Sequence, residues 1–267
     1  RLGFALTPCE ARKSVVRDGY CINYTRPLIG TFINNAFDNP PFQRSVTILD
    51  PAFSNPGGGR EAAESVLSLT ALGAPMLAPT IHQWSFGGQH EVFPHAILNV
   101  SYVGSRGLRL MRPFNLNNPE PGVAAANRVH VNSVRPYLGY GSITQRQSTA
   151  SSIYHSLQVS FNRRVRRGLS LGAAYTFSKS IDNASSERGG TDVPPDSRNV
   201  NAERGLSDFD RKHVLTFNYI CFLPNPVARA SRLAALLNGW EVSGITRLYS
   251  GRPFDVTLSA DVANIGA

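Results

Sequence analysis

Alternation of apolar and polar positions is the dominant pattern along the chain. From Ile153 to Arg164 the odd positions are mainly apolar and the even positions are polar. The same alternation returns from Leu169 to Ser178, after the short segment Val165–Gly168. Because successive side chains of a strand point to opposite faces, this pattern predicts a long β-hairpin with one apolar face and one polar face.

Weaker copies of the alternation predict eight principal strands in all. They are expected around 2–6, 14–24, 84–86, 96–102, 153–164, 169–178, 215–219 and 240–248. Helical spacing of apolar residues occurs only at 61–72 and 228–237, which predicts two short peripheral helices. Two further strand-like stretches, 42–49 and 139–147, are expected to pair within loop hairpins.

The predicted connections between these strands alternate in length. Short joins are expected at 8–13, 91–95 and 165–168, and long joins at 25–81, 104–152 and 181–210. A moderate join follows at 223–238. Since antiparallel strands reverse direction, all short joins of the alternating series fall at one end of the sheet, as in an outer-membrane β-barrel. The alternative is a soluble all-β ligand-binding module, such as a carbohydrate-binding sandwich, in which the apolar stripes form a core.

Composition and charge narrow the possible classes. The 267 residues are 42% hydrophobic and 17% charged, which excludes a disordered polyelectrolyte. No apolar run approaches the ~18 residues of a transmembrane helix. The net charge of +9 comes almost entirely from arginine. The densest basic cluster lies at a predicted turn, and the aromatic residues lie on apolar faces, so we expect no nucleic-acid partner. This cluster consists of Arg163, Arg164, Arg166 and Arg167.

Candidate catalytic and metal-binding chemistry is sparse. Ser207, Asp210 and His213 suggest a small hydrolase as a third, weaker hypothesis, but no nucleophile-elbow motif surrounds them. We interpret Asp208 and its charged neighbours up to Lys212 as a polar collar at a strand end. The histidines and loop acids lack the spacing of zinc or calcium sites. We therefore predict no enzymatic activity, no cofactor and no metal. Three free thiols are expected, at Cys9, Cys21 and Cys221.

Four segments in order resemble the β-barrel of TonB-dependent outer-membrane receptors. They read NVSYVGSRG (99–107), YHSLQVSFNRRVRRGLSLGAAYTFSKSID (154–182), LSDFDRKHVLTFNYICFLP (206–224) and NGWEVSGITRLYSGRPF (238–254). More narrowly, the chain is similar to the Oar-like group, whose members carry a carboxypeptidase-regulatory-like domain. Aromatic residues near strand ends, such as Trp84, Tyr102 and Trp240, agree with a bilayer-facing surface.

The resemblance implies a partial barrel of the bacterial outer membrane. Residues 1–267 would be eight to ten strands of a barrel of about 22, with the plug, the N-terminal domain and the C-terminal strands outside this sequence. An open antiparallel sheet with two unpaired edges is therefore expected. The implied function is uptake of a large, scarce nutrient, with outer-membrane lipid and, through the plug, the TonB complex as partners. The polar positions predicted to face the lumen are Gln158, Ser160, Asn162, Thr176 and Ser178.

Overall fold

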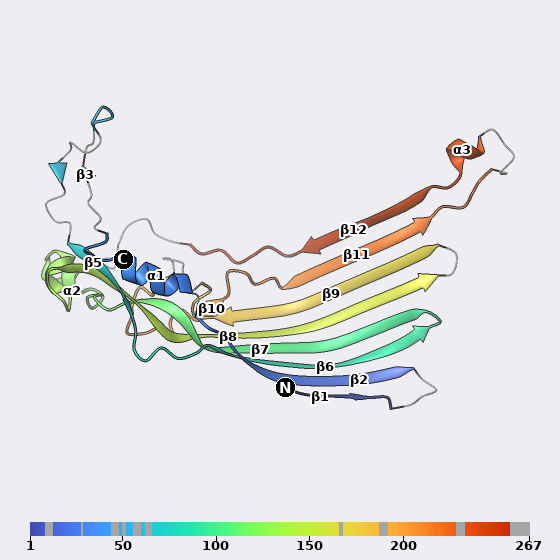
Figure 1. Cartoon of the computed structure of the whole chain (residues 1–267), viewed down its shortest axis with the longest axis horizontal. Coiled ribbons are helices and arrows are strands. Elements are labelled where there is room, and N and C mark those ends of the chain that lie inside the picture. The colour runs from blue at the N-terminus through green and yellow to red at the C-terminus, as the bar shows by residue number, and fades with distance from the viewer. Residues whose placement is uncertain are drawn as a thin grey trace.

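One large sheet organises the chain in the computed structural model (Figure 1). The structure describes residues 1–8, 13–27, 29–43, 48–49, 52–55, 60–61, 66–165, 168–186, 192–227 and 233–256. All eight predicted principal strands are confirmed, and they neighbour one another in chain order. They are β1 (Leu2–Leu6), β2 (Ser14–Tyr24), β6 (Thr80–Phe93), β7 (Ala96–Asn115), β8 (Tyr140–Val165), β9 (Leu169–Asp182), β11 (His213–Phe222) and β12 (Glu241–Tyr249).

The sheet is open. Its path begins at β1 and ends at β12, and these two strands do not pair with each other. Every neighbouring pair on the path is antiparallel. The prediction of an incomplete antiparallel barrel with two unpaired edges is therefore confirmed.

The remaining elements are short and lie in the connections. The helical segments are α1 (Ile29–Phe37), α2 (Val123–Asn127), a 3₁₀ turn (Val131–Val134) and α3 (Ala234–Leu237), and the short strands are β3 (Ile48–Leu49), β4 (Arg60–Glu61), β5 (Leu67–Leu72) and β10 (Gly205–Leu206). Among the described residues, no helix has the length and apolar character needed to cross a bilayer.

Strand ends differ from the sequence predictions in the long connections. The helix expected at 61–72 is wrong, because Leu67–Leu72 forms β5, parallel to the start of β8. The stretch 139–147 is not a separate loop hairpin but the first part of β8, which runs for 26 residues instead of the expected 10 to 12. β9 pairs with β8 only as far as Ser152, so β5 occupies the edge of β8 that β9 leaves free.

Two other predicted segments are only partly covered. Residues 44–47 lie outside the described residues, and Ile48–Leu49 pairs with β4 as a short loop hairpin. Of the helix expected at 228–237, the structure describes only α3, and residues 228–232 lie outside its described part. Cys21 and Cys221 are free thiols, whereas Cys9 also falls outside the described ranges.

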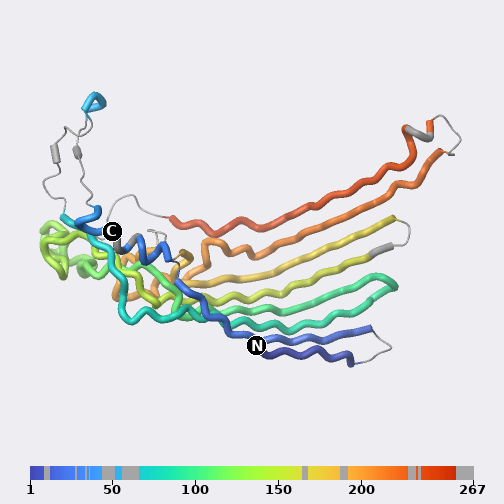
Figure 2. Tube along the Cα trace, viewed as in Figure 1, coloured from blue at the N-terminus to red at the C-terminus, as the bar shows by residue number. Residues whose placement is uncertain are grey.

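The expected sorting of connections by length is confirmed. The long connections 25–79, 116–139 and 183–212 all leave the same end of the sheet. At the opposite end, β1, β6 and β8 end and β2, β7 and β9 begin, as Figure 2 shows. We refer to these two ends as the loop end and the turn end.

The apolar face of the sheet is uncovered. Among the described residues, the buried hydrophobic positions are only Ala96, Met111, Ala124 and Ala150. Leu157 and Phe177, which are paired on the predicted apolar stripe, are each 43% exposed. A sandwich would bury this stripe against a second sheet, and no such sheet covers it in the described part of the chain. Exposure of the stripe is instead what a lipid-facing surface requires.

Candidate functional site

The polar face of β8 and β9 brings the five predicted lumen-facing residues together. Gln158 lies opposite Thr176 and Ser160 opposite Ala174 in the antiparallel register. Ser178 is 8% exposed, and its hydroxyl donates to the Arg211 carbonyl at 2.8 Å. All five side chains thus share one face, and the orientation of that face toward a lumen stays a prediction.

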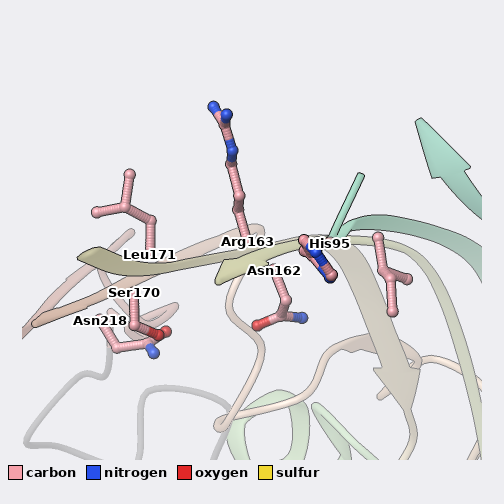
Figure 3. A pocket seen from close by; sticks show the side chains of 7 residues that line it. His95, Asn162, Arg163, Ser170, Leu171 and Asn218 are labelled. Atoms are coloured by element: carbon pink, nitrogen blue, oxygen red, sulfur yellow. The ribbon is translucent and has the colours of Figure 1, made fainter. Parts of the chain in front are cut away.

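The turn end shows the separation of the two faces directly. A pocket of about 450 Å³ there includes the predicted residue Asn162. In Figure 3, Asn162, Ser170 and Asn218 point to one side of the strands, and Arg163 and Leu171 point to the other. The alternation read from the sequence is therefore a physical separation of polar from apolar side chains.

Three tyrosine–histidine pairs mark the apolar face. The hydroxyl oxygen of each tyrosine lies 2.6–2.8 Å from Nδ1 of a histidine on the neighbouring strand. The first pair links β2 to β6, the second β7 to β8, and the third β9 to β11. Each pair therefore joins the two strands that a long connection links. The pairs are Tyr20–His82, Tyr102–His155 and Tyr175–His213.

These pairs lie at a common level above the turn end. Each tyrosine is six residues from the turn-end residue of its strand, which is Ser14, Ala96 or Leu169. The histidine partners lie farther along their strands, and His155 is ten residues from Val165. At ~3.3 Å per residue and a tilt of ~35–45°, the tyrosines lie ~15 Å and His155 lies ~25 Å above these residues, in the upper half of a ~25 Å apolar band.

The register, taken together with the common level of the three tyrosines, gives an estimate of strand tilt. From Tyr20 the paired row crosses β6 and reaches Gly104 on β7, two residues beyond Tyr102. The row from Tyr102 likewise reaches Phe177 on β9, two residues beyond Tyr175. The row of tyrosines therefore falls behind the row of paired residues by one residue on each successive strand. This shift is ~3.3 Å along the strand for every ~4.8 Å across the sheet, which corresponds to a tilt of roughly 35°. This value agrees with the ~35–45° tilt of transmembrane barrels.

A buried asparagine network orders the connection between β7 and β8. The Asn117 side-chain amide donates to the carbonyls of Tyr137, Tyr140 and Gly141 at 2.7–3.1 Å. Its oxygen accepts from the Tyr137 amide at 2.7 Å, and Asn117 is fully buried. The side chain therefore holds both ends of the connection together.

The same network joins two of the long connections. Asn118 donates to the Pro195 carbonyl at 3.1 Å, and Arg198 donates to the Pro119 carbonyl at 2.6 Å. Segments 116–139 and 192–204 therefore form one ordered unit at the loop end, which we call the loop cap.

A second pocket, of about 380 Å³, lies at the loop end beside the loop cap. Arg112 from β7 and Asp182 from the end of β9 line it, and both are buried. The carboxylates of Asp192, Glu203 and Asp208 come from the connection 183–212. Burial raises the pKa of Asp192, and hydrogen bonds from the backbone of Ser186 and Ser185 oppose that shift. We call this cavity the loop-end pocket.

The residues of the hydrolase hypothesis have other partners. The Ser207 hydroxyl lies 2.9 Å from that of Ser180, and Asp210 accepts from the Ser180 amide at 2.6 Å. His213 is hydrogen-bonded to Tyr175 on the apolar face. Ser207 and Asp210 are thus hydrogen-bonded to the end of β9. The three residues do not form a Ser–His–Asp relay.

These features define an outer-membrane β-barrel, and the comparison with protein families agrees. The chain belongs to the family described as outer membrane beta barrel domain, whose model matches residues 1–267. The protein is accordingly a component of the bacterial outer membrane.

Among solved structures, the chain is similar to the outer membrane transporter YddB from Escherichia coli. It is 11% identical, with a TM-score of 0.49 over 89% of this chain and 31% of the transporter. The chain thus spans about a third of that protein's length. No curated protein matches the sequence.

Sequence reasoning missed the asparagine network and Arg112. The asparagines stand in the segment NLNNPE (115–120), whose turn-forming residues predicted only a loop. Arg112 lies beyond two register shifts in the β7–β8 ladder, at Gly107/Leu110 and Leu110/Arg112. No local pattern predicts such irregularities, so the position of Arg112 in the loop-end pocket could not be read from the alternation.

Proposed function

We propose that this chain forms part of the barrel of a TonB-dependent receptor that takes up a large, scarce nutrient, without enzymatic activity. The observation that carries the proposal is the polar face of the sheet, which leads from the turn end toward the loop-end pocket. Such a face offers hydrogen-bonding groups along a route for a polar solute. Membership of the outer-membrane β-barrel family supports a location of this route in the outer membrane.

The width of the sheet supports a large barrel. Eight strands in sequence leave the two edge strands unpaired, although eight strands suffice to close the smallest barrels. Unpaired backbone groups cannot remain in hydrocarbon, so further strands must complete the barrel. A barrel with many more strands has an interior that is wide enough for a plug or a large solute.

The proposed partners follow from the surfaces. Outer-membrane lipid contacts the exposed apolar stripe, including Leu157 and Phe177. The nutrient first meets the loop cap. The TonB complex acts through a plug that the barrel would enclose, in keeping with the receptor resemblance. The narrower assignment to the Oar-like group belongs to this proposal.

Growth of the native bacterium tests the uptake function. A strain lacking the full-length gene is compared with its complemented strain on limiting peptide, glycan or ferric-chelate sources, each with and without an active TonB complex. We expect a defect on one class of large solute, and loss of TonB should abolish the advantage of the complemented strain. Equal growth of both strains on every source, with the protein folded in the outer membrane, would refute the proposal.

A further inference from the structure

The loop-end pocket combines one buried cation with several carboxylates. Its volume of about 380 Å³ lies within the ~300–1,000 Å³ range of small-ligand sites. Arg112 forms part of the lining and is only 1% exposed. A charge held so far from water needs partners in the protein or in a ligand.

The Arg112 guanidinium has unused hydrogen-bonding capacity. Its Nη2 donates to the Asp192 carbonyl at 3.2 Å. Its Nε and Nη1 are buried and have no hydrogen-bond partner among the described residues. Because buried donors are normally satisfied, these two groups indicate an acceptor supplied by a ligand.

Carboxylates surround this cation on the pocket wall. Asp182 is 6% exposed and accepts from the Ser185 hydroxyl at 3.0 and 3.1 Å. Glu203 and Asp208 are exposed, and no ion pair within the described ranges neutralises them. With Asp192 and Asp255, the lining holds five carboxylates against the Arg112 guanidinium, a formal charge of −4.

We propose that the loop-end pocket binds the carboxyl-terminal end of a basic peptide. The terminal carboxylate accepts a hydrogen bond from Arg112, and the cationic side chain lies among the carboxylates of Asp182, Glu203 and Asp208. This inference rests on the proposed uptake function and names its substrate class.

Ligands with a single type of charge fit this lining less well. A bare metal cation would leave the free Arg112 donors unpartnered and would lie beside a positive charge. A phosphate or a sulfated sugar would satisfy Arg112 but would meet five carboxylates. Charges of like sign a few ångströms apart are costly where water is partly excluded. A ligand that carries both an anion and a cation satisfies both parts of the pocket.

Calorimetry on the full-length protein in detergent micelles tests the proposal. The probes are the tripeptide Gly-Gly-Arg, its carboxyl-terminal amide and Gly-Gly-Gly. We expect Gly-Gly-Arg to bind at least ~10-fold more tightly than either of the other two, because each lacks one charge-assisted contact.

Variants assign the two contacts separately. Arg112→Gln should remove the difference between Gly-Gly-Arg and its amide. Glu203→Gln combined with Asp208→Asn should remove the difference between Gly-Gly-Arg and Gly-Gly-Gly, and both of these residues are exposed, so folding is preserved. Glu120→Gln is the matched control, because Glu120 is an exposed loop acid outside the pocket lining.

Two results would overturn the proposal. One is failure of Gly-Gly-Arg to bind a folded barrel. The other is equal binding of the acid and the amide. Calorimetry needs neither a membrane potential nor TonB, so these results leave the uptake proposal standing. Conversely, peptide binding by a protein whose loss affects growth on no source would refute uptake alone.

Discussion

Placing an arginine on the apolar stripe should destabilise the barrel far more than placing one on the polar face. Val159 is the chosen site because it lies on the apolar stripe, directly opposite Tyr175 and six residues, or ~15 Å at the tilt of a barrel strand, from Val165 at the turn end. It therefore lies near the middle of the predicted apolar band. An arginine at the midplane of a barrel costs about 2–4 kcal/mol, which reduces the folding equilibrium constant by roughly 30- to 1,000-fold.

The matched control is the neighbouring residue on the opposite face. Gln158→Arg removes the 3.2 Å hydrogen bond from Gln158 to Ser156, which contributes about 1 kcal/mol or less. The new arginine on this face would lie in a polar surrounding. The difference between Val159→Arg and Gln158→Arg should therefore be at least ~1 kcal/mol.

Urea unfolding of the full-length protein in phospholipid vesicles measures both variants, with tryptophan fluorescence as the readout. Val159→Arg should shift the unfolding midpoint to clearly lower urea, and Gln158→Arg should shift it little. Equal shifts would show that the two faces meet the same environment, and the assignment of the apolar stripe to lipid would then be wrong.

Three further outcomes are expected. Asn117→Ala should cost about 2–4 kcal/mol, because it removes the hydrogen bonds from this buried side chain to three carbonyls and one amide. Limited proteolysis of cells displaying the protein should then cleave the loop cap faster, and unchanged resistance would contradict the network's role. Gly104→Ala would place a Cβ atom against the Trp84 ring and should cost about 1–3 kcal/mol with altered tryptophan emission, whereas Gly88→Ala, whose nearest atom is 4.0 Å away, should show neither effect in the same urea titration. Because burial raises the pKa of Asp192 in the folded protein, protonation favours the fold, and this contribution is lost as the pH rises from the unfolded to the folded pKa. Unfolding midpoints measured against pH should therefore show the wild type gaining stability relative to Asp192→Asn as the pH falls through that window, and parallel curves would contradict the burial of this carboxyl.

The strand pattern was predictable because it depends on local alternation. The hairpin of β8 and β9 follows from side chains that alternate over 10 or more consecutive residues. The same reasoning failed at Leu67–Leu72, where Val66 and Leu69 also fit helical spacing. There the deciding factor is the free edge of β8 beyond Ser152, a feature about 80 residues away in the chain. A local pattern contains no information on such an edge.

The candidate site was predictable only in part. The polar face was predicted from the alternation, and its five residues do share one face. The loop-end pocket instead gathers residues from Arg112 to Asp255, and their meeting depends on register shifts and loop packing. The tyrosine–histidine pairs likewise depend on register, because each partner lies diagonally across two strands. The sequence shows the residues but not their pairing.

The three tyrosine–histidine pairs have a consequence for how such a protein diversifies. Each pair fastens two neighbouring strands below the long connection that links them, so the strands remain held from below when that connection changes. Because segments 116–139 and 192–204 are bonded to each other, these two surface regions would have to change together, while the membrane-embedded wall is inherited intact.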